Sequence, residues 1–86
     1  MTNDRLETGK RIRKFRIQNN LTQAQFAESL DVSTNFISEI ETGKKGISQD
    51  TLYRLCMRYH LSADYLLFGK QGPTPSEYTL SEFLSS

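Results

Sequence analysis

One short helical stretch in the first half of the chain carries a group of small hydrogen-bonding side chains. On a wheel of about 100° per residue, this polar face and its two flanks are formed by Asn35, Ser38, Thr42, Thr34 and Glu39. An amide, hydroxyls and a carboxylate are the groups that read base edges in a DNA major groove. The alternative is an ordinary solvated helix face, because many surface helices are equally polar.

The helix before this stretch is predicted by its capping residues. Thr22 followed three residues later by Gln25 is a capping box, so a helix is expected over residues 23–30. Its apolar face would hold Phe26, Ala27 and Leu30. The capping box therefore fixes the first residue of this helix, and its apolar face is expected to be buried.

The polar face itself lies on a second helix, which a tight turn should separate from the first. Ser33 is a good N-cap for a helix over residues 34–42, and Gly43 is suited to the left-handed conformation that ends it. The side opposite the polar face carries Phe36, Ile37 and Ile40. A helix with one buried side, held at its start by a corner, has the shape that enters a major groove.

Residues 21–43 resemble the Cro and lambda-repressor-like helix-turn-helix family, also called the XRE family. The positions that match its pattern are Leu21, Thr22, Gln23, Ala27, Val32, Ser33, Ile37, Ser38, Glu41 and Gly43. Two positions depart: Phe26 stands where Leu is usual and Asp31 where Gly is usual. Asp tolerates the left-handed conformation better than most residues, so the turn should survive with some strain.

The resemblance and the side-chain chemistry together predict two sets of contacts with DNA. The base-contacting set is Ser33, Thr34, Asn35, Ser38 and Glu39. The backbone-contacting set is Gln23, Thr42, Lys44 and Lys45. The resemblance implies that Gln23 holds a phosphate and that the two lysines, which directly follow the helix over residues 34–42, contact the DNA backbone. Asn35 is the best base reader, because its amide can make a paired contact with adenine.

A helix over residues 4–19 should precede this unit, with Leu6, Gly9, Ile12 and either Phe15 or Ile17 facing inward. Five basic residues between positions 10 and 16 form either a solvated face or a nucleic-acid surface. The resemblance implies that one of them, Arg16, pairs with Glu41 and ties the first helix to the third.

Two further helices are predicted downstream. Ser48 caps the first of them, which ends near residue 59 and carries an apolar stripe of Leu52, Leu55, Cys56 and Tyr59. Cys56 is expected to be a small buried hydrophobe. Ser62 caps a fifth helix over residues 63–68 that ends at Gly69, and Tyr65, Leu66 and Phe68 are candidates to close the bundle.

The chain has 86 residues and a formal net charge of +1, which suits one small domain and excludes no class of partner. All the basic residues precede position 71, and the charged residues of the segment 71–86 are Glu77 and Glu82. A single cysteine indicates a reducing, cytoplasmic environment. No apolar run reaches the roughly 18 residues of a membrane span, and the polar first ten residues do not predict a signal peptide.

The composition changes at a Gly- and Pro-rich linker, so residues 1–69 are expected to form the domain and residues 70–86 a linker and tail. Residues 76–84 of the tail could form a short sixth helix, and three outcomes stay open for it: docking on its own domain, docking on a partner, or disorder. Whether it continues into a longer protein also stays open. The surface predicted for dimerisation is Tyr65, Leu67, Phe68, Tyr78, Leu80, Phe83 and Leu84.

These features predict an all-α, compact five-helix domain that binds double-stranded DNA in a sequence-specific manner as a homodimer on an inverted repeat and acts as a repressor. The alternative is an antitoxin-type module whose main partner is a protein bound through the tail. An enzyme is disfavoured, since the sequence has one His and one Cys and lacks a glycine-rich phosphate loop. No metal or cofactor is expected.

Overall fold

The computed structural model describes residues 4–70, and regular structure within that range is entirely helical. The five helices are α1 (Asp4–Gln18), α2 (Gln23–Ser29), α3 (Thr34–Glu41), α4 (Gln49–Tyr59) and α5 (Ala63–Phe68). The prediction of an all-α, five-helix fold is confirmed. Between residues 4 and 70, no helix is both long enough and apolar enough to cross a membrane.

The four helices after α1 all begin in the same way. Each N-cap residue has an extended backbone, and its side-chain oxygen accepts a hydrogen bond from the backbone N–H three residues later; the caps are Thr22, Ser33, Ser48 and Ser62. At α2 the reciprocal bond is also present, because the Thr22 N–H donates to Gln25 Oε1 at 2.9 Å. Local sequence therefore sets every one of these starting points.

The helix ends lie slightly earlier than predicted. Leu30 and Thr42 are C-cap residues rather than the last residues of α2 and α3, and α1 ends one residue before position 19. The left-handed conformation is adopted by Asn20, Asp31, Gly43, His60 and Gly69. Asp31, with φ of 58°, thus takes the conformation expected of it in the turn.

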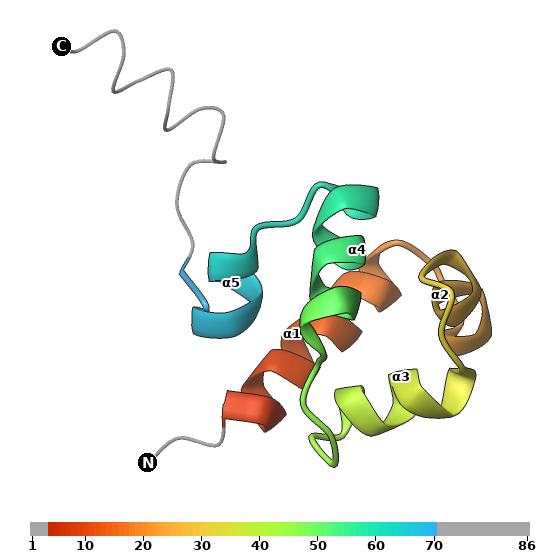
Figure 1. Cartoon of the computed structure of the whole chain (residues 1–86), viewed down its shortest axis with the longest axis horizontal. Coiled ribbons are helices and arrows are strands. Elements are labelled where there is room, and N and C mark those ends of the chain that lie inside the picture. The colour runs from red at the N-terminus through yellow and green to blue at the C-terminus, as the bar shows by residue number, and fades with distance from the viewer. Residues whose placement is uncertain (1–3, 71–86) are drawn as a thin grey trace, which may run out of the picture.

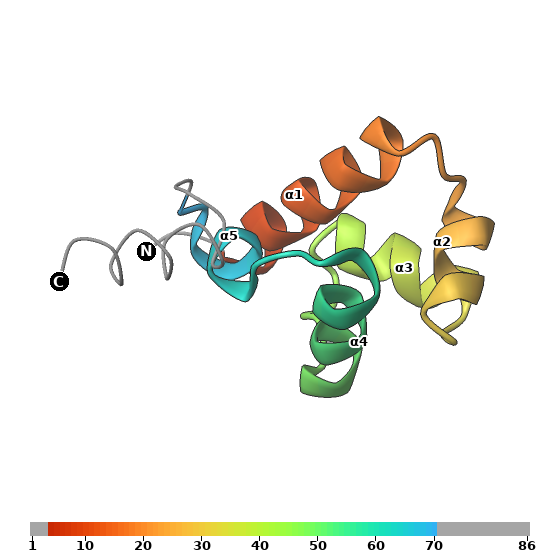
Figure 2. The same cartoon turned by 90° about the horizontal axis from the view of Figure 1, so that it is seen from above.

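The helices are arranged around α1 and α3 (Figure 1). α2 and α3 meet in a corner at one end of the molecule, whereas α5 lies against α1 at the other end, as the view from above also shows (Figure 2). α1 also packs along α3. The two outermost elements, α2 and α5, are therefore joined through the α1–α3 pair.

The core draws apolar side chains from all five helices. Its fully buried members are Ile12, Phe26, Ala27, Leu30, Ile37, Ile40, Leu55 and Leu66. Leu52, Cys56 and Tyr59 are partly buried against them. Of the two inward candidates on α1, Phe15 packs on the core, where its ring meets Tyr59 edge-on with centroids 5.2 Å apart.

The alternative between Phe15 and Ile17 is decided for Phe15, and two other apolar residues, Phe36 and Phe68, differ from expectation. Ile17 is 53% exposed, because it lies two residues from Phe15 and two positions on a helix turn the side chain to another side. Phe36 is only partly buried at the margin of the core. Phe68 is 66% exposed, so Leu66 and not Phe68 closes the bundle from α5.

Candidate nucleic-acid interface

The corner between α2 and α3 is held by backbone hydrogen bonds and by the core. The Val32 N–H donates to the Ala27 carbonyl at 3.0 Å, which folds the turn back on α2. Ile37 and Ile40 are both buried and fix the rotation of α3 about its own axis. The opposite side of α3 must therefore face away from the domain.

The start of α3 presents free polar side chains. Thr34 and Asn35 are exposed, and neither side chain bonds to another residue in the described range 4–70. The Ser33 Oγ accepts from the Phe36 N–H at 3.0 Å, which leaves the hydroxyl hydrogen available. These three predicted contact residues thus form one accessible patch of donors and acceptors.

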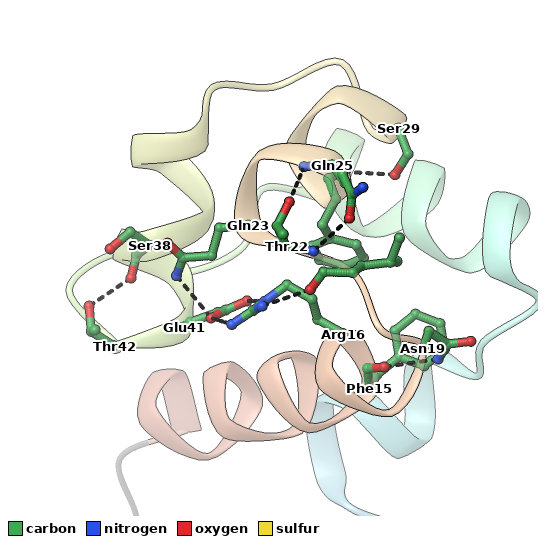
Figure 3. Close-up of polar contacts among 12 residues, drawn as sticks. Phe15, Arg16, Asn19, Thr22, Gln23, Gln25, Ser29, Ser38, Glu41 and Thr42 are labelled. Carbon is green, nitrogen blue, oxygen red and sulfur yellow. Dashed lines mark hydrogen bonds and ion pairs between the residues drawn. The ribbon is translucent and has the colours of Figure 1, made fainter.

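The later part of the polar face is more constrained. Thr42 Oγ1 donates to the Ser38 carbonyl at 2.9 Å (Figure 3). A threonine hydroxyl has a single hydrogen, so a phosphate contact by Thr42 would require this hydroxyl to rotate away from the helix. Ser38 itself is half-buried between the patch and Thr42.

A buried ion pair lies directly behind this surface. Arg16 donates from Nε to Glu41 Oε2 at 2.7 Å and from Nη2 to Oε1 at 3.1 Å, and the two side chains are 12% and 2% exposed. Arg16 Nη1 also donates to the Leu21 carbonyl at 2.9 Å. One guanidinium therefore links α1 to α3 and to the segment that enters α2.

Gln23 is the third partner of the same carboxylate. Its Nε2 donates to Glu41 Oε1 at 3.2 Å, as the close-up shows (Figure 3). A glutamine amide has two N–H donors, so one remains for a phosphate at the start of α2. This bond was not foreseen from the sequence: both residues match the helix-turn-helix pattern, but the pattern by itself does not pair their side chains.

The loop after α3 holds the two lysines in different environments. Lys45 Nζ lies 3.6 Å from Glu39 Oε1 and 6.0 Å from the centroid of the Phe36 ring. The Lys45 N–H also donates to the Glu39 carbonyl at 3.2 Å. Lys44 is exposed and forms no ion pair with any residue between 4 and 70.

Comparison with known proteins agrees with this geometry. A family model described as a helix-turn-helix domain matches residues 9–72, which includes the α2–α3 corner and the Arg16–Glu41 pair. The chain belongs to the XRE-type helix-turn-helix family. The resemblance expected from residues 21–43 is thereby confirmed.

Curated relatives of this helix-turn-helix protein are named as regulators. The chain is 36% identical over 64 residues to the HTH-type transcriptional regulator PrpR of Mycobacterium tuberculosis, covering 74% of this chain and 13% of PrpR. It is 36% identical over 62 residues to the HTH-type transcriptional regulator ImmR of Bacillus subtilis, covering 72% of this chain and 49% of ImmR. The chain thus spans half or less of the length of these relatives.

Two further matches come from an antitoxin and a solved structure. The antitoxin PezA of Streptococcus pneumoniae is 32% identical over 54 residues, covering 63% of this chain and 34% of PezA. The crystal structure of a transcriptional regulator from Listeria innocua superposes with a TM-score of 0.67 at 25% identity, covering 90% of this chain and 71% of that one.

Three of the residues predicted for dimerisation lie on α5 of this helix-turn-helix protein. Tyr65 packs against the core, Leu67 is half-buried, and Phe68 projects into solvent. The remaining members of that group, Tyr78, Leu80, Phe83 and Leu84, lie outside the described residues. Of the basic cluster on α1, Arg11 is used internally, since its Nη1 donates to the Leu66 carbonyl at 3.1 Å.

Cys56 sits in the stripe of α4 that faces the core. Burial raises the pKa of its thiol above the ordinary value, because desolvation disfavours the thiolate. Residues 4–70 contain no group of three or more His, Cys, Asp or Glu side chains placed to hold a metal ion. The thiol therefore has the environment of a packing residue.

Proposed function

We propose that this chain is a sequence-specific double-stranded-DNA-binding regulator of transcription, acting in the cytoplasm as a repressor. The observation that carries the proposal is the pair of free, exposed side chains of Thr34 and Asn35 at the start of a helix whose other side is locked into the core. A rigid helix start with unbonded donors and acceptors is what major-groove reading requires. The names of PrpR and ImmR support the same class of function.

The side chains proposed to contact DNA divide by their chemistry into those that contact bases and those that contact phosphates. Asn35 makes a paired contact with adenine, Thr34 offers its methyl group to thymine, and Ser33, Ser38 and Glu39 complete the base-contacting set. Gln23, Lys44, Lys45 and, after rotation of its hydroxyl, Thr42 hold the phosphates. In this arrangement Glu41 positions Gln23 while Arg16 neutralises the carboxylate.

The protein acts as a two-fold dimer in this proposal. One recognition helix covers too few base pairs to discriminate among about 10⁶ or more competing genomic sites. The exposed ring of Phe68, together with Tyr65, Leu67 and the apolar residues of the tail, supplies the pairing surface. Two copies would read an inverted repeat with half-site centres roughly 10 base pairs apart.

A selection of bound molecules from a pool of random duplexes tests the proposal. An enriched motif with two-fold symmetry is the expected result, and a pool that stays random after repeated rounds would contradict it. A chain ending at Lys70 tests the pairing surface, because it keeps all five helices. It should be monomeric in solution and bind the inverted repeat more weakly; equal affinity and a dimer mass would show that residues 71–86 are not part of the interface.

The similarity to PezA supports a second candidate, an antitoxin whose main partner is a protein. The two candidates differ in the role of residues 71–86. An antitoxin lacking that segment should lose a protein partner and keep its affinity for a half-site. Co-expression with a candidate toxin, followed by measurement of complex formation with and without the segment, separates the two.

A further inference from the structure

Glu39 and Lys45 are joined in the free protein, although their expected contacts on DNA are different. The Lys45 Nζ lies 3.6 Å from Glu39 Oε1, and these side chains are 58% and 28% exposed. Lys45 is also anchored through its backbone, whose N–H donates to the Glu39 carbonyl at 3.2 Å. The loop is therefore held in place while the ammonium group is free to exchange partners.

The Lys45 Nζ lies 3.6 Å from Glu39 Oε1, so movement of this side chain onto a phosphate lengthens its contact with Glu39. If Lys45 moves to a phosphate, it leaves the Glu39 carboxylate, which then faces the polyanionic groove without a counter-charge and is repelled. If Lys45 stays with Glu39, that phosphate loses its contact. The two roles assigned to these residues are thus linked by a single ion pair.

We propose that the Glu39–Lys45 pair is a specificity-determining element in which Lys45 binds a DNA phosphate only where the base facing Glu39 is cytosine. This inference rests on the proposed function and names a further way in which the same surface selects its site. The cytosine N4 amino group is a donor in the major groove and pairs with a carboxylate. On such a site it replaces the ammonium group as partner of Glu39, and Lys45 becomes available to the backbone.

The surroundings of the pair fit such an exchange. The Lys45 side chain is exposed and Glu39 is half-buried, and an ion pair at the protein surface contributes little to stability and is readily broken. Phe36 lies beneath the ammonium group, with its ring centroid 6.0 Å from Nζ, and remains a neighbour of the side chain as it moves. Lys44, which precedes Lys45 and forms no ion pair within residues 4–70, contacts phosphate whichever base faces Glu39 and serves as a matched control.

The salt dependence of affinity tests this inference, because the slope of log K against log salt changes by about 0.9 per phosphate contact. Full-length parent, Lys45→Gln and Lys44→Gln are titrated with the duplex enriched by selection and with a scrambled duplex. Lys45→Gln should make the negative slope shallower by about 0.9 on the enriched duplex and leave it unchanged on the scrambled one. Lys44→Gln should make the slope shallower by about 0.9 on both duplexes.

Glu39→Gln provides the second arm, because glutamine cannot hold the lysine by charge. In the Glu39→Gln background, Lys45 is free to contact phosphate on any DNA, so Lys45→Gln should make the slope shallower on both duplexes. An equal reduction by Lys45→Gln on both duplexes in the parent background, or no reduction on either, overturns the inference while leaving an enriched motif, and hence the proposed function, intact. If no duplex is bound more tightly than the scrambled one, the inference and the proposed function both fail.

Discussion

The Arg16 guanidinium and the Glu41 carboxylate form a bidentate pair, with Nε to Oε2 at 2.7 Å and Nη2 to Oε1 at 3.1 Å, behind the surface that α3 presents to solvent. Only 2% of the Glu41 side chain is exposed. The same carboxylate accepts from Gln23 Nε2. The pair therefore joins α1, α2 and α3, and it orients a side chain at the proposed DNA surface.

Removing one partner of this pair should be strongly destabilising. Arg16→Met strands a buried carboxylate, and the free energy of unfolding should fall by about 3 kcal/mol or more. Urea unfolding followed by circular dichroism measures this loss. Lys10→Met is the control, because Lys10 pairs with Glu7 at 3.6 Å on the surface, with side chains 62% and 43% exposed. Equal losses in the two variants would show that the Arg16–Glu41 pair contributes no more than a surface pair.

Gly9 should be intolerant of a methyl group. A Cβ at this position would lie 2.2 Å from the Ile40 carbonyl oxygen and 2.9 Å from that of Glu41, so Gly9→Ala must push α1 and α3 apart. Alanine otherwise stabilises a helix by roughly 0.5–1 kcal/mol relative to glycine, so the sign of the change is diagnostic. We expect a lower melting temperature.

Gly46→Ala is the matched control for this prediction. Its nearest neighbour would be Arg5 Nε at 3.3 Å, part of a flexible side chain that can move aside. Its melting temperature should stay close to that of the parent. A Gly9→Ala variant as stable as the parent would place α1 farther from α3 than the structure does.

Asn35→Ala tests base reading. The side chain is exposed and unbonded within residues 4–70, so its removal should leave stability unchanged. Affinity for the enriched duplex should fall by about 1–3 kcal/mol, with a much smaller loss on scrambled DNA. Fluorescence anisotropy with both duplexes measures the difference. Equal losses on the two duplexes would show that Asn35 does not read sequence.

Cys56 should make stability depend on alkaline pH. Burial raises the pKa of its thiol in the folded state, so folding favours the protonated form. This contribution is complete below the unfolded thiol pKa of about 8.5 and is lost as pH rises through the folded pKa. The urea midpoint of the parent should therefore decline more steeply with rising pH than that of Cys56→Ala. Parallel pH profiles would mean that the thiol has the same pKa in both states.

Much of the fold follows from short-range features of the sequence. The N-caps Thr22, Ser33, Ser48 and Ser62 mark the starts of four helices, because capping involves residues only three positions apart. The left-handed turn at Asp31 was predicted from the family resemblance, because Asp31 occupies the position where glycine is usual. The helix-turn-helix pattern could be recognised because its spacing encodes this local geometry.

The tertiary structure alone decided the partners of Gln23 and Lys45 and which sides of the helices face inward. A helical wheel gives relative angles but not the rotation of one helix against another, so it left Phe15 and Ile17 as alternatives, of which packing buries Phe15. The bonds from Gln23 to Glu41 and from Lys45 to Glu39 depend on how α2 and the loop after α3 are placed around α3. Local sequence therefore determined where the helices of this protein begin and turn, whereas packing between helices determined which polar groups remain free to meet DNA.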